Sequence, residues 1–430
     1  MAWRLGPVNG DPAVRRYHKS MSSSLNPRAT SVPLRQDALI IGLVGLAHSA
    51  SHFSQLLLAP LFPWLKDAFD VSYAQLGFLM TLFFAVSCAV QALSGFVVDR
   101  LGPRPVLYLG LLLLGLAALG YSLSTGYWML AASAVLGGIG NGVFHPVDYT
   151  LLNRKVSVPR LGHAYSVHGI TGSLGWALAP ALTVGLALAY SWRVALAAAA
   201  ALIFCVLAAL LGSHRHLDLS PAPAEKAGAP VADSGLDFLK IPAVWMCFAF
   251  FFLHAFVLSV IQAFAPEAAR QLHDVPLPLV AVCLTVYMLG SAAGMVGGGF
   301  LAANPAHCER VVGAGFCMAA GVTLVLALLK VPAQAVPVLF GVMGFVSGMA
   351  GPSRDMLVKR STPENATGRV YGVVYGGLDI GQAVSPLAFG LLMDAGRFQG
   401  VLLGLALLQA VLVASAFHVR RVRRTARVAA

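Results

Sequence analysis

The chain has 430 residues, of which 58% are hydrophobic and only 11% are charged, and its formal net charge is +12. A water-soluble protein of this composition would expose more apolar surface than water tolerates, so the composition excludes a soluble globular domain. The six cysteines are scattered without a pairing or C-x-x-C pattern, which argues against disulfides and against a thiolate metal site.

Apolar stretches long enough to cross a bilayer recur along the chain. The polar residues 1–37 precede them and are predicted to form a cytoplasmic tail. Because the first apolar stretch is too long for the hydrophobic region of a signal peptide, no cleaved signal is expected. We predict an all-α integral membrane protein with twelve transmembrane helices, over residues 38–64, 72–98, 104–123, 127–152, 162–189, 192–212, 241–266, 276–302, 310–330, 333–358, 368–393 and 398–419.

A change of composition divides these spans into two groups of six. Residues 213–240 are rich in Pro, Ala and Gly with scattered charges, which is typical of a flexible linker. We therefore predict two pseudo-symmetric six-helix bundles, one over residues 38–212 and one over residues 241–419. Residues 420–430 form a basic tail, which we expect to contact anionic membrane lipid rather than nucleic acid.

The two halves are related by an internal repeat. Residues 138–180 align with residues 344–386 without a gap, at a constant offset of 206. Glycine, proline and arginine residues that recur at this offset are informative, because each meets a particular backbone or charge requirement. Such a repeat is typical of a transporter whose site lies between the halves and opens to each side in turn. The matched pairs include Gly138/Gly344, Gly142/Gly348, Pro146/Pro352, Arg154/Arg360, Gly175/Gly381 and Pro180/Pro386, with His48/His254 and Pro60/Pro266 at the same offset.

The distribution of basic residues predicts the orientation. If both termini are cytoplasmic, few of the 29 Lys and Arg residues fall on the outer side of the membrane. This asymmetry favours a multi-pass protein of the inner (plasma) membrane with both ends inside. The residues on the outer side are then Lys66, Arg193, Arg270, Lys330 and Arg397.

Polar residues are concentrated in particular spans. The third, sixth, ninth and twelfth spans have no ionisable side chain in their interiors, whereas the first, fourth, fifth, seventh, tenth and eleventh carry polar and ionisable groups. A charge near the bilayer centre costs at least about 2.5–3.5 kcal/mol on insertion scales, so these groups are expected to face a central cavity. The predicted substrate-binding residues are His48, His52, Gln55, Asn141, His145, His168, His254 and Gln382.

The spacing of the histidines allows two interpretations. His48, His52 and Gln55 follow one another at helical spacing and share one face of the first span. His48 and His52 have the spacing of two zinc ligands, but the glutamate of an H-E-x-x-H hydrolase is absent. Counting the rise per residue places His145 and His168 closer to the cytoplasm than His48, a spread that argues against one metal site. A His-rich metal-handling protein of the membrane is kept as the alternative from another class.

Asp379 is the residue predicted to carry a coupled proton. It lies in the middle of the eleventh span among glycine and apolar residues. Burial away from water favours the neutral form of a carboxyl group, so such a residue binds or releases a proton as its surroundings change.

A charged pair is predicted to act as a gate. Asp148 and Arg354 occupy equivalent positions of the repeat near the cytoplasmic ends of their spans, and Asp355 adjoins Arg354. These partly exposed charges are expected to pair when the cytoplasmic side closes. The alternative is that each charge lies independently at the level of the lipid headgroups.

The loop between the second and third spans carries a family signature. It reads Gly95-Phe-Val-Val-Asp99-Arg100-Leu-Gly102-Pro103-Arg104. With the two six-span halves, it resembles the signature of the major facilitator superfamily, except that Pro103 replaces a basic residue. The resemblance implies that Asp99 pairs with the cytoplasmic N-terminal end of the eleventh span, where the helix dipole favours a carboxylate. It also implies that Asp99, Arg100 and Arg104 are gating residues that stabilise the outward-open state.

Two further passages resemble the fosmidomycin-resistance type of efflux transporter within that superfamily. They are residues 47–63, which include His48 and His52, and residues 140–146, which end the fourth span. Ala134 stands where many proton-coupled drug exporters carry arginine, and the glycine pair that antiporters carry soon after the proline of the fifth span is absent. Because the sequence differs from exporters at both places, uptake is kept as an alternative direction of transport.

The sequence therefore predicts a secondary active transporter, not an enzyme. It has no G-x-x-x-x-G-K-[ST] motif for ATP, and no cofactor or metal is expected. The predicted function is proton-coupled efflux of a small amphiphilic or anionic compound by a monomer whose partners are its substrate, protons and membrane lipid. The alternative among transporters is proton-linked uptake of an organic acid.

Overall fold

The computed structural model describes residues 33–219, 242–302, 307–361 and 367–428. At residue 243 and over residues 354–361, 367–375 and 415–428 it describes the backbone alone. Helices occupy all twelve predicted spans. Within the described residues, ten helices are long and apolar enough to cross a membrane, and the shorter apolar stretch Phe398–Ala414 lies in the last span. The predicted fold class, an all-α membrane protein with two six-helix bundles, is confirmed.

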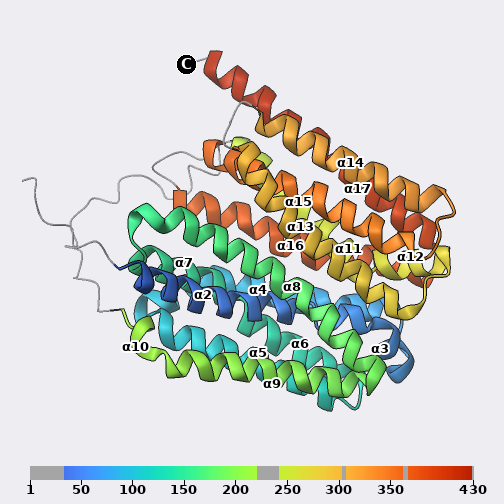
Figure 1. The fold of residues 1–430 in the computed structure, drawn as a ribbon, viewed down its shortest axis with the longest axis horizontal. Coiled ribbons are helices and arrows are strands. Elements are labelled where there is room, and N and C mark those ends of the chain that lie inside the picture. The colour runs from blue at the N-terminus through green and yellow to red at the C-terminus, as the bar shows by residue number, and fades with distance from the viewer. Residues whose placement is uncertain (1–32, 220–241, 303–306, 362–366, 429–430) are drawn as a thin grey trace, which may run out of the picture.

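The first half contains α2 (Leu34–Gln55), η1 (Ala59–Leu61), α3 (Phe62–Phe69), α4 (Tyr73–Leu101), α5 (Pro103–Leu123), α6 (Tyr127–Asn141), α7 (Phe144–Lys155), η2 (Val158–Arg160), α8 (Leu161–Ala189), α9 (Trp192–Gly212) and α10 (His214–Leu217). The second half contains α11 (Pro242–Ala263), α12 (Ala265–His273), α13 (Leu277–Ala302), α14 (Cys308–Leu328), α15 (Ala335–Ser361), α16 (Thr367–Asp394) and α17 (Phe398–Val428). Figure 1 shows the blue-to-green helices of the first half below the yellow-to-red helices of the second.

The first span of each half is broken near its end, which corrects the prediction of unbroken spans over residues 38–64 and 241–266. Pro60 lies in the short helix η1 after α2, and Pro266 lies at the second position of α12. Proline has no backbone N–H to donate and its ring clashes with the preceding turn, so both helices restart there. The short helices that follow end in the same way, at Asp70 (φ 50°) and Asp274 (φ 56°), both left-handed.

The repeated glycines explain how each bundle packs. A Cβ atom on Gly138 would lie 2.5 Å from a backbone oxygen of α4, and one on Gly344 would lie 2.1 Å from a backbone oxygen of α13. In the same way, a Cβ on Gly175 would lie 2.3 Å from a backbone oxygen of α2, and one on Gly381 would lie 2.4 Å from a backbone oxygen of α11. Only glycine permits these approaches, so the repeat preserves two equivalent helix crossings in each half.

The two halves meet along two helix pairs. α4 packs against α16, and α8 packs against α13. The Thr81 hydroxyl on α4 donates to the carbonyl oxygen of Ala383 on α16 at 2.6 Å, and Gly77 lies against the carbonyl of Pro386. The end of the molecule that carries α3 and α12, at the right in Figure 1, is called the α3 end; the opposite end, which carries α10, is called the α10 end. The distribution of basic residues predicts that the α3 end faces outward.

Candidate substrate and coupling sites

A buried carboxylate joins three helices of the first half. Asp148 on α7 is 0% exposed, and its Oδ2 lies 3.0 Å from Nδ1 of His48 on α2 and 3.1 Å from Nε2 of His168 on α8. α7 restarts after a break at Gly142 and Val143, which turns Asp148 toward α2 and α8. The prediction of a partly exposed Asp148 was therefore wrong, because the carboxylate is engaged inside the first half.

Four imidazole rings gather around this carboxylate, and we call His48, His52, His145 and His168 with Asp148 the histidine cluster. The ring centroid of His48 lies 3.5 Å from that of His168, 4.3 Å from that of His52 and 5.5 Å from that of His145. The predicted spread of these histidines in height was wrong. A straight-helix count of the rise misses the break between α6 and α7 and the close crossing of α2 and α8.

Glycine makes room for the rings. A Cβ atom on Gly172 of α8 would lie 2.7 Å from the ring of His52 and 3.0 Å from Nε2 of His48. The indole of Trp176, one turn further along α8, lies beside the His52 ring, with ring centroids 4.2 Å apart. A larger residue at 172 would displace both histidines, so the cluster depends on this glycine.

A second polar network follows within the same bundle. Asn141 Oδ1 accepts hydrogen bonds from Ser51 Oγ at 2.7 Å and from Gln55 Nε2 at 3.2 Å. Its Nδ2 donates to Ser87 Oγ at 2.8 Å, and Trp176 Nε1 donates to Gln55 Oε1 at 3.0 Å. The structure thus brings the predicted residues Gln55 and Asn141 together. Sequence reasoning missed Ser51, Ser87 and Trp176, since neutral polar residues in a span have no insertion cost large enough to mark them.

Three buried polar atoms of the histidine cluster have no hydrogen-bond partner within the part of the chain that the structure describes. They are Nδ1 of His52, Nδ1 of His145 and Oδ1 of Asp148. Leaving a buried donor or acceptor unpaired costs about 1–3 kcal/mol. Atoms arranged in this way are suited to a ligand or an ion.

Asp379 lies at the contact between the two halves. Its Oδ2 accepts a hydrogen bond from Nε2 of Gln91 on α4 at 2.9 Å. Asp379 is 9% exposed. Gln382, one turn further along α16, is also buried, and its backbone oxygen accepts from Ser259 Oγ at 3.4 Å. Sequence reasoning missed Gln91, the partner of Asp379.

His254 lies within the second half. Its ring meets Phe316 of α14 edge-on, with centroids 5.8 Å apart. His48 belongs to the histidine cluster of the first half. The prediction that this repeat-related pair flanks one substrate stays a prediction.

The structure describes the side chains of only some of the predicted gating residues. Asp99 and Arg100 are exposed at the α10 end of α4, and Arg104 forms an ion pair with Asp218 directly after α10. The side chains of Arg354 and Asp355, and those at the start of α16, lie outside the described residues. The pairings of Asp148 with Arg354 and of Asp99 with the start of α16 therefore stay predictions.

Asp394 joins the halves at the α3 end, and the sequence did not indicate it. It ends α16, and its carboxylate accepts from the backbone N–H groups of Tyr73 at 2.6 Å and Ala74 at 2.9 Å. These are the first N–H groups of α4, which have no partner inside that helix. A residue of the second half thus caps a helix of the first.

A second contact at the α3 end involves Tyr73. Its hydroxyl lies 3.3 Å from Oε1 of Glu267, which lies in the first turn of α12. Glu267 also accepts from Nε of Arg270 at 2.7 Å, and this hydrogen bond raises the pKa of Arg270. The Glu267 carboxylate therefore contacts one residue of each half, Tyr73 and Arg270.

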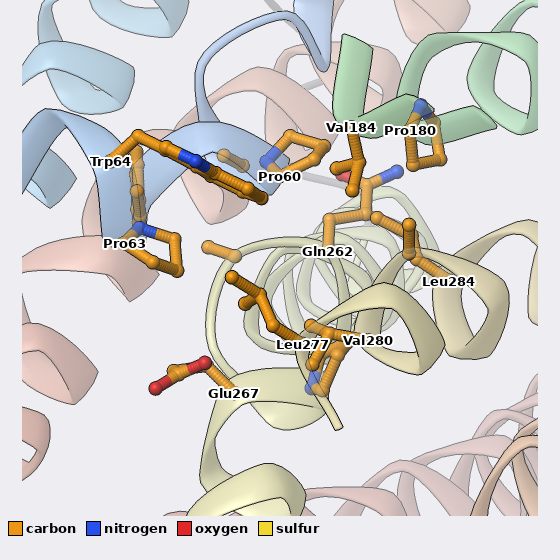
Figure 2. Close-up of a pocket in the computed structure, with 15 residues that line it drawn as sticks. Pro60, Pro63, Trp64, Pro180, Val184, Gln262, Glu267, Leu277, Val280 and Leu284 are labelled. Carbon is orange, nitrogen blue, oxygen red and sulfur yellow. The ribbon is translucent and has the colours of Figure 1, made fainter. Parts of the chain in front are cut away.

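A small cavity lies between the halves at the α3 end. Figure 2 shows Pro60 and Trp64 of the first half on one side of it, and Gln262, Leu277 and Leu284 of the second half on the other. Gln262 is 2% exposed, and neither polar atom of its amide has a hydrogen-bond partner among the described residues. Because both halves form its walls, the cavity must change shape when the halves move.

Replacing Asp394 by Ala is expected to loosen the contact at the α3 end. A carboxylate at the start of a helix contributes up to about 2 kcal/mol in a partly buried geometry, and Ser72 remains the N-cap of α4. The carboxylate comes from the other half, so its loss shifts the balance between closed and open forms by up to about 30-fold. The check is maleimide labelling of a cysteine introduced at Val184 in the cavity, after removal of the chain's own cysteines.

The matched control for this labelling is Asp67→Ala, which removes an exposed carboxylate of α3. Faster labelling in Asp394→Ala and parental labelling in Asp67→Ala are expected. Equal rates in both variants would mean that Asp394 does not hold the halves together.

Comparison with known proteins assigns the chain a family. A family model described as the Major Facilitator Superfamily matches residues 44–353. A solved bacterial homolog of the human lysosomal transporter Spinster superimposes with a TM-score of 0.73 over 91% of this chain and 98% of that chain, at 14% sequence identity.

Curated relatives match shorter regions. The fosmidomycin resistance protein of Escherichia coli is 30% identical over 156 residues, which is 36% of this chain and 38% of that protein. A probable sulfoacetate transporter of Cupriavidus necator is 23% identical over 36% of each chain. The membrane sensor protein UhpC of Escherichia coli is 30% identical over 29% of this chain and 28% of its own. The matched regions thus cover well under half of these relatives.

Proposed function

The chain belongs to the major facilitator superfamily, and we propose that it exports a small amphiphilic or anionic compound in exchange for protons. Membership supports a secondary transporter, which moves a small molecule across a membrane. The proposal adds the direction, the coupled proton and the class of substrate. It also places a monomer in the inner membrane with both termini in the cytoplasm.

The contact between Gln91 and Asp379 carries the proposal. It joins α4 of one half to α16 of the other, and these helices must separate at one end when the access of a central site alternates. A charged carboxylate within the membrane costs at least about 2.5–3.5 kcal/mol on insertion scales, and protonation removes that cost. Proton binding at Asp379 then favours the closed contact, and proton release favours the opened one.

The partly exposed edge of the histidine cluster supports the substrate class. His52 and His145 are half-buried, as is Gln55 beside them. Imidazole and amide groups donate hydrogen bonds to polar or anionic groups, and Trp176 offers an apolar face. Two relatives are named for the compounds fosmidomycin and sulfoacetate. These two compounds are the first to test as substrates.

Uptake of an organic acid is the second candidate. The relative named as a probable sulfoacetate transporter supports it. The absence of arginine at Ala134 also favours it over drug export.

The test is a flux assay in proteoliposomes with an imposed pH gradient. A panel that contains fosmidomycin, sulfoacetate and simple organic acids is offered with the gradient in each direction. Export by proton exchange predicts that substrate accumulates on the acidic side of the membrane. Accumulation on the alkaline side would establish proton-linked uptake instead. Substrate fluxes that do not change with the imposed pH gradient would contradict proton coupling.

A further inference from the structure

The histidine cluster has the donor set of a metal site. One ring nitrogen from each of His48, His145 and His168 lies within 4.8 Å of the others. These residues come from α2, α7 and α8, so the helix packing alone brings them together. In tetrahedral coordination with bonds of 2.0–2.1 Å, ligand nitrogens lie about 3.3 Å apart. To reach that spacing and point at one ion, the three rings must shift, and the stacked rings of His48 and His168 must turn toward each other.

Asp148 supplies both orientation and charge. Its Oδ2 accepts from Nδ1 of His48, which leaves the opposite ring nitrogen, Nε2, as the ligand atom. A carboxylate that holds the far nitrogen of a ligating histidine is the usual second partner in zinc sites, and it makes the imidazole a better ligand. Because Oδ2 lies beside Nδ1 of His48, the carboxylate positions this ring and is not itself a ligand.

The unpaired atoms inside the cluster favour a cation over an anion. Oδ1 of Asp148 and Nδ1 of His145 are buried without a hydrogen-bond partner in the described part of the chain. An anion at these inner atoms, unlike one at the outer edge beside His52 and Gln55, would meet a carboxylate with 0% exposure, which is unfavourable at low dielectric. A divalent cation would take the unpaired nitrogen of His145 as a ligand and offset the carboxylate charge.

We propose that His48, His145 and His168 bind one divalent transition-metal ion of the zinc type, and that Asp148 positions the ring of His48. Imidazole nitrogens suit Zn²⁺, Co²⁺ or Ni²⁺, whereas Mg²⁺ and Ca²⁺ prefer oxygen ligands throughout. The ion enters past His145 and His52, which are half-buried while His48 and His168 are buried. This inference goes beyond the proposed transport function and does not depend on it.

The experiment titrates Co²⁺ into the purified protein and follows the visible absorption of the bound ion. The protein carries no polyhistidine tag, and the exposed pair His214 and His216 is replaced by Ala to remove a second metal-binding position. One equivalent of Co²⁺ with the intense spectrum of tetrahedral coordination is expected, and one equivalent of Zn²⁺ should displace it. Substrate and membrane are absent, so the result is separate from the test of transport.

Single substitutions locate the ion. His145→Ala and His168→Ala are each expected to weaken Co²⁺ binding at least tenfold, and Asp148→Asn by about 10- to 100-fold. The matched control is His163→Ala, an exposed histidine on the same helix as His168, which should bind like the parent. Gel filtration and thermal unfolding without metal establish that each variant is folded. His145→Ala is the safest of these changes, because the ring is half-buried.

The proposal is overturned by either of two results. One is a parent protein that binds neither Co²⁺ by absorption nor Zn²⁺ by calorimetry. The other is a folded His145→Ala variant with the affinity and spectrum of the parent. If His168→Ala does not fold, His145→Ala and Asp148→Asn still decide the question.

Discussion

Replacing Asp148 by Ala is expected to destabilise the first half more than any other single polar substitution described here. The change removes the acceptor for two buried imidazoles, those of His48 and His168. Leaving a buried donor without its acceptor costs about 1–3 kcal/mol for each imidazole. The melting temperature of the purified protein, followed by tryptophan fluorescence, should fall by several degrees, and transport should be lost.

Asp148→Asn and Asp67→Ala make this prediction specific. The asparagine keeps one acceptor for the histidines, so a smaller loss of stability is expected. Asp67 is exposed on α3, and its replacement should leave the melting temperature unchanged. If Asp148→Ala unfolds at the temperature of the parent, the carboxylate does not hold α2, α7 and α8 together.

Replacing Asp379 by Asn is expected to abolish accumulation driven by a pH gradient. Asparagine is nearly the same shape and still accepts a hydrogen bond from Gln91, but it cannot exchange a proton. Substrate movement down its own gradient should therefore continue, while uphill movement stops. The measurement compares the two fluxes in the same proteoliposomes.

The control for this experiment is Asp67→Asn, which makes the same chemical change at an exposed position. It should behave like the parent in both fluxes. An Asp379→Asn protein that still concentrates substrate against its gradient would remove Asp379 from the coupling mechanism.

The fold could be predicted because its determinants are local and periodic. Apolar length defines a span, and the glycines of the repeat are required wherever two backbones approach closely. Gly138 and Gly344 are examples, since a Cβ on either would collide with the facing helix. The sequence also marked Asp379, because a carboxylate inside a span is costly unless it has a function or a partner.

The arrangement of the histidine cluster could not be predicted in the same way. Depth along a straight helix separates His48 from His145, but the break after Asn141 allows their ring centroids to lie 5.5 Å apart. Such breaks depend on tertiary packing. Asp394 was missed for another reason: it acts by capping a helix of the other half, a partnership that no spacing in one segment reveals.

The most direct test of proton-coupled exchange is to record proton movement that substrate itself causes. Proteoliposomes are loaded with a pH-sensitive dye, without an imposed gradient, and the compound of the panel that the protein carries is added to one side. The account predicts that protons move opposite to the substrate in the parent and in Asp67→Asn, and that no proton movement follows in Asp379→Asn. Substrate flux in the parent without any proton movement would contradict it.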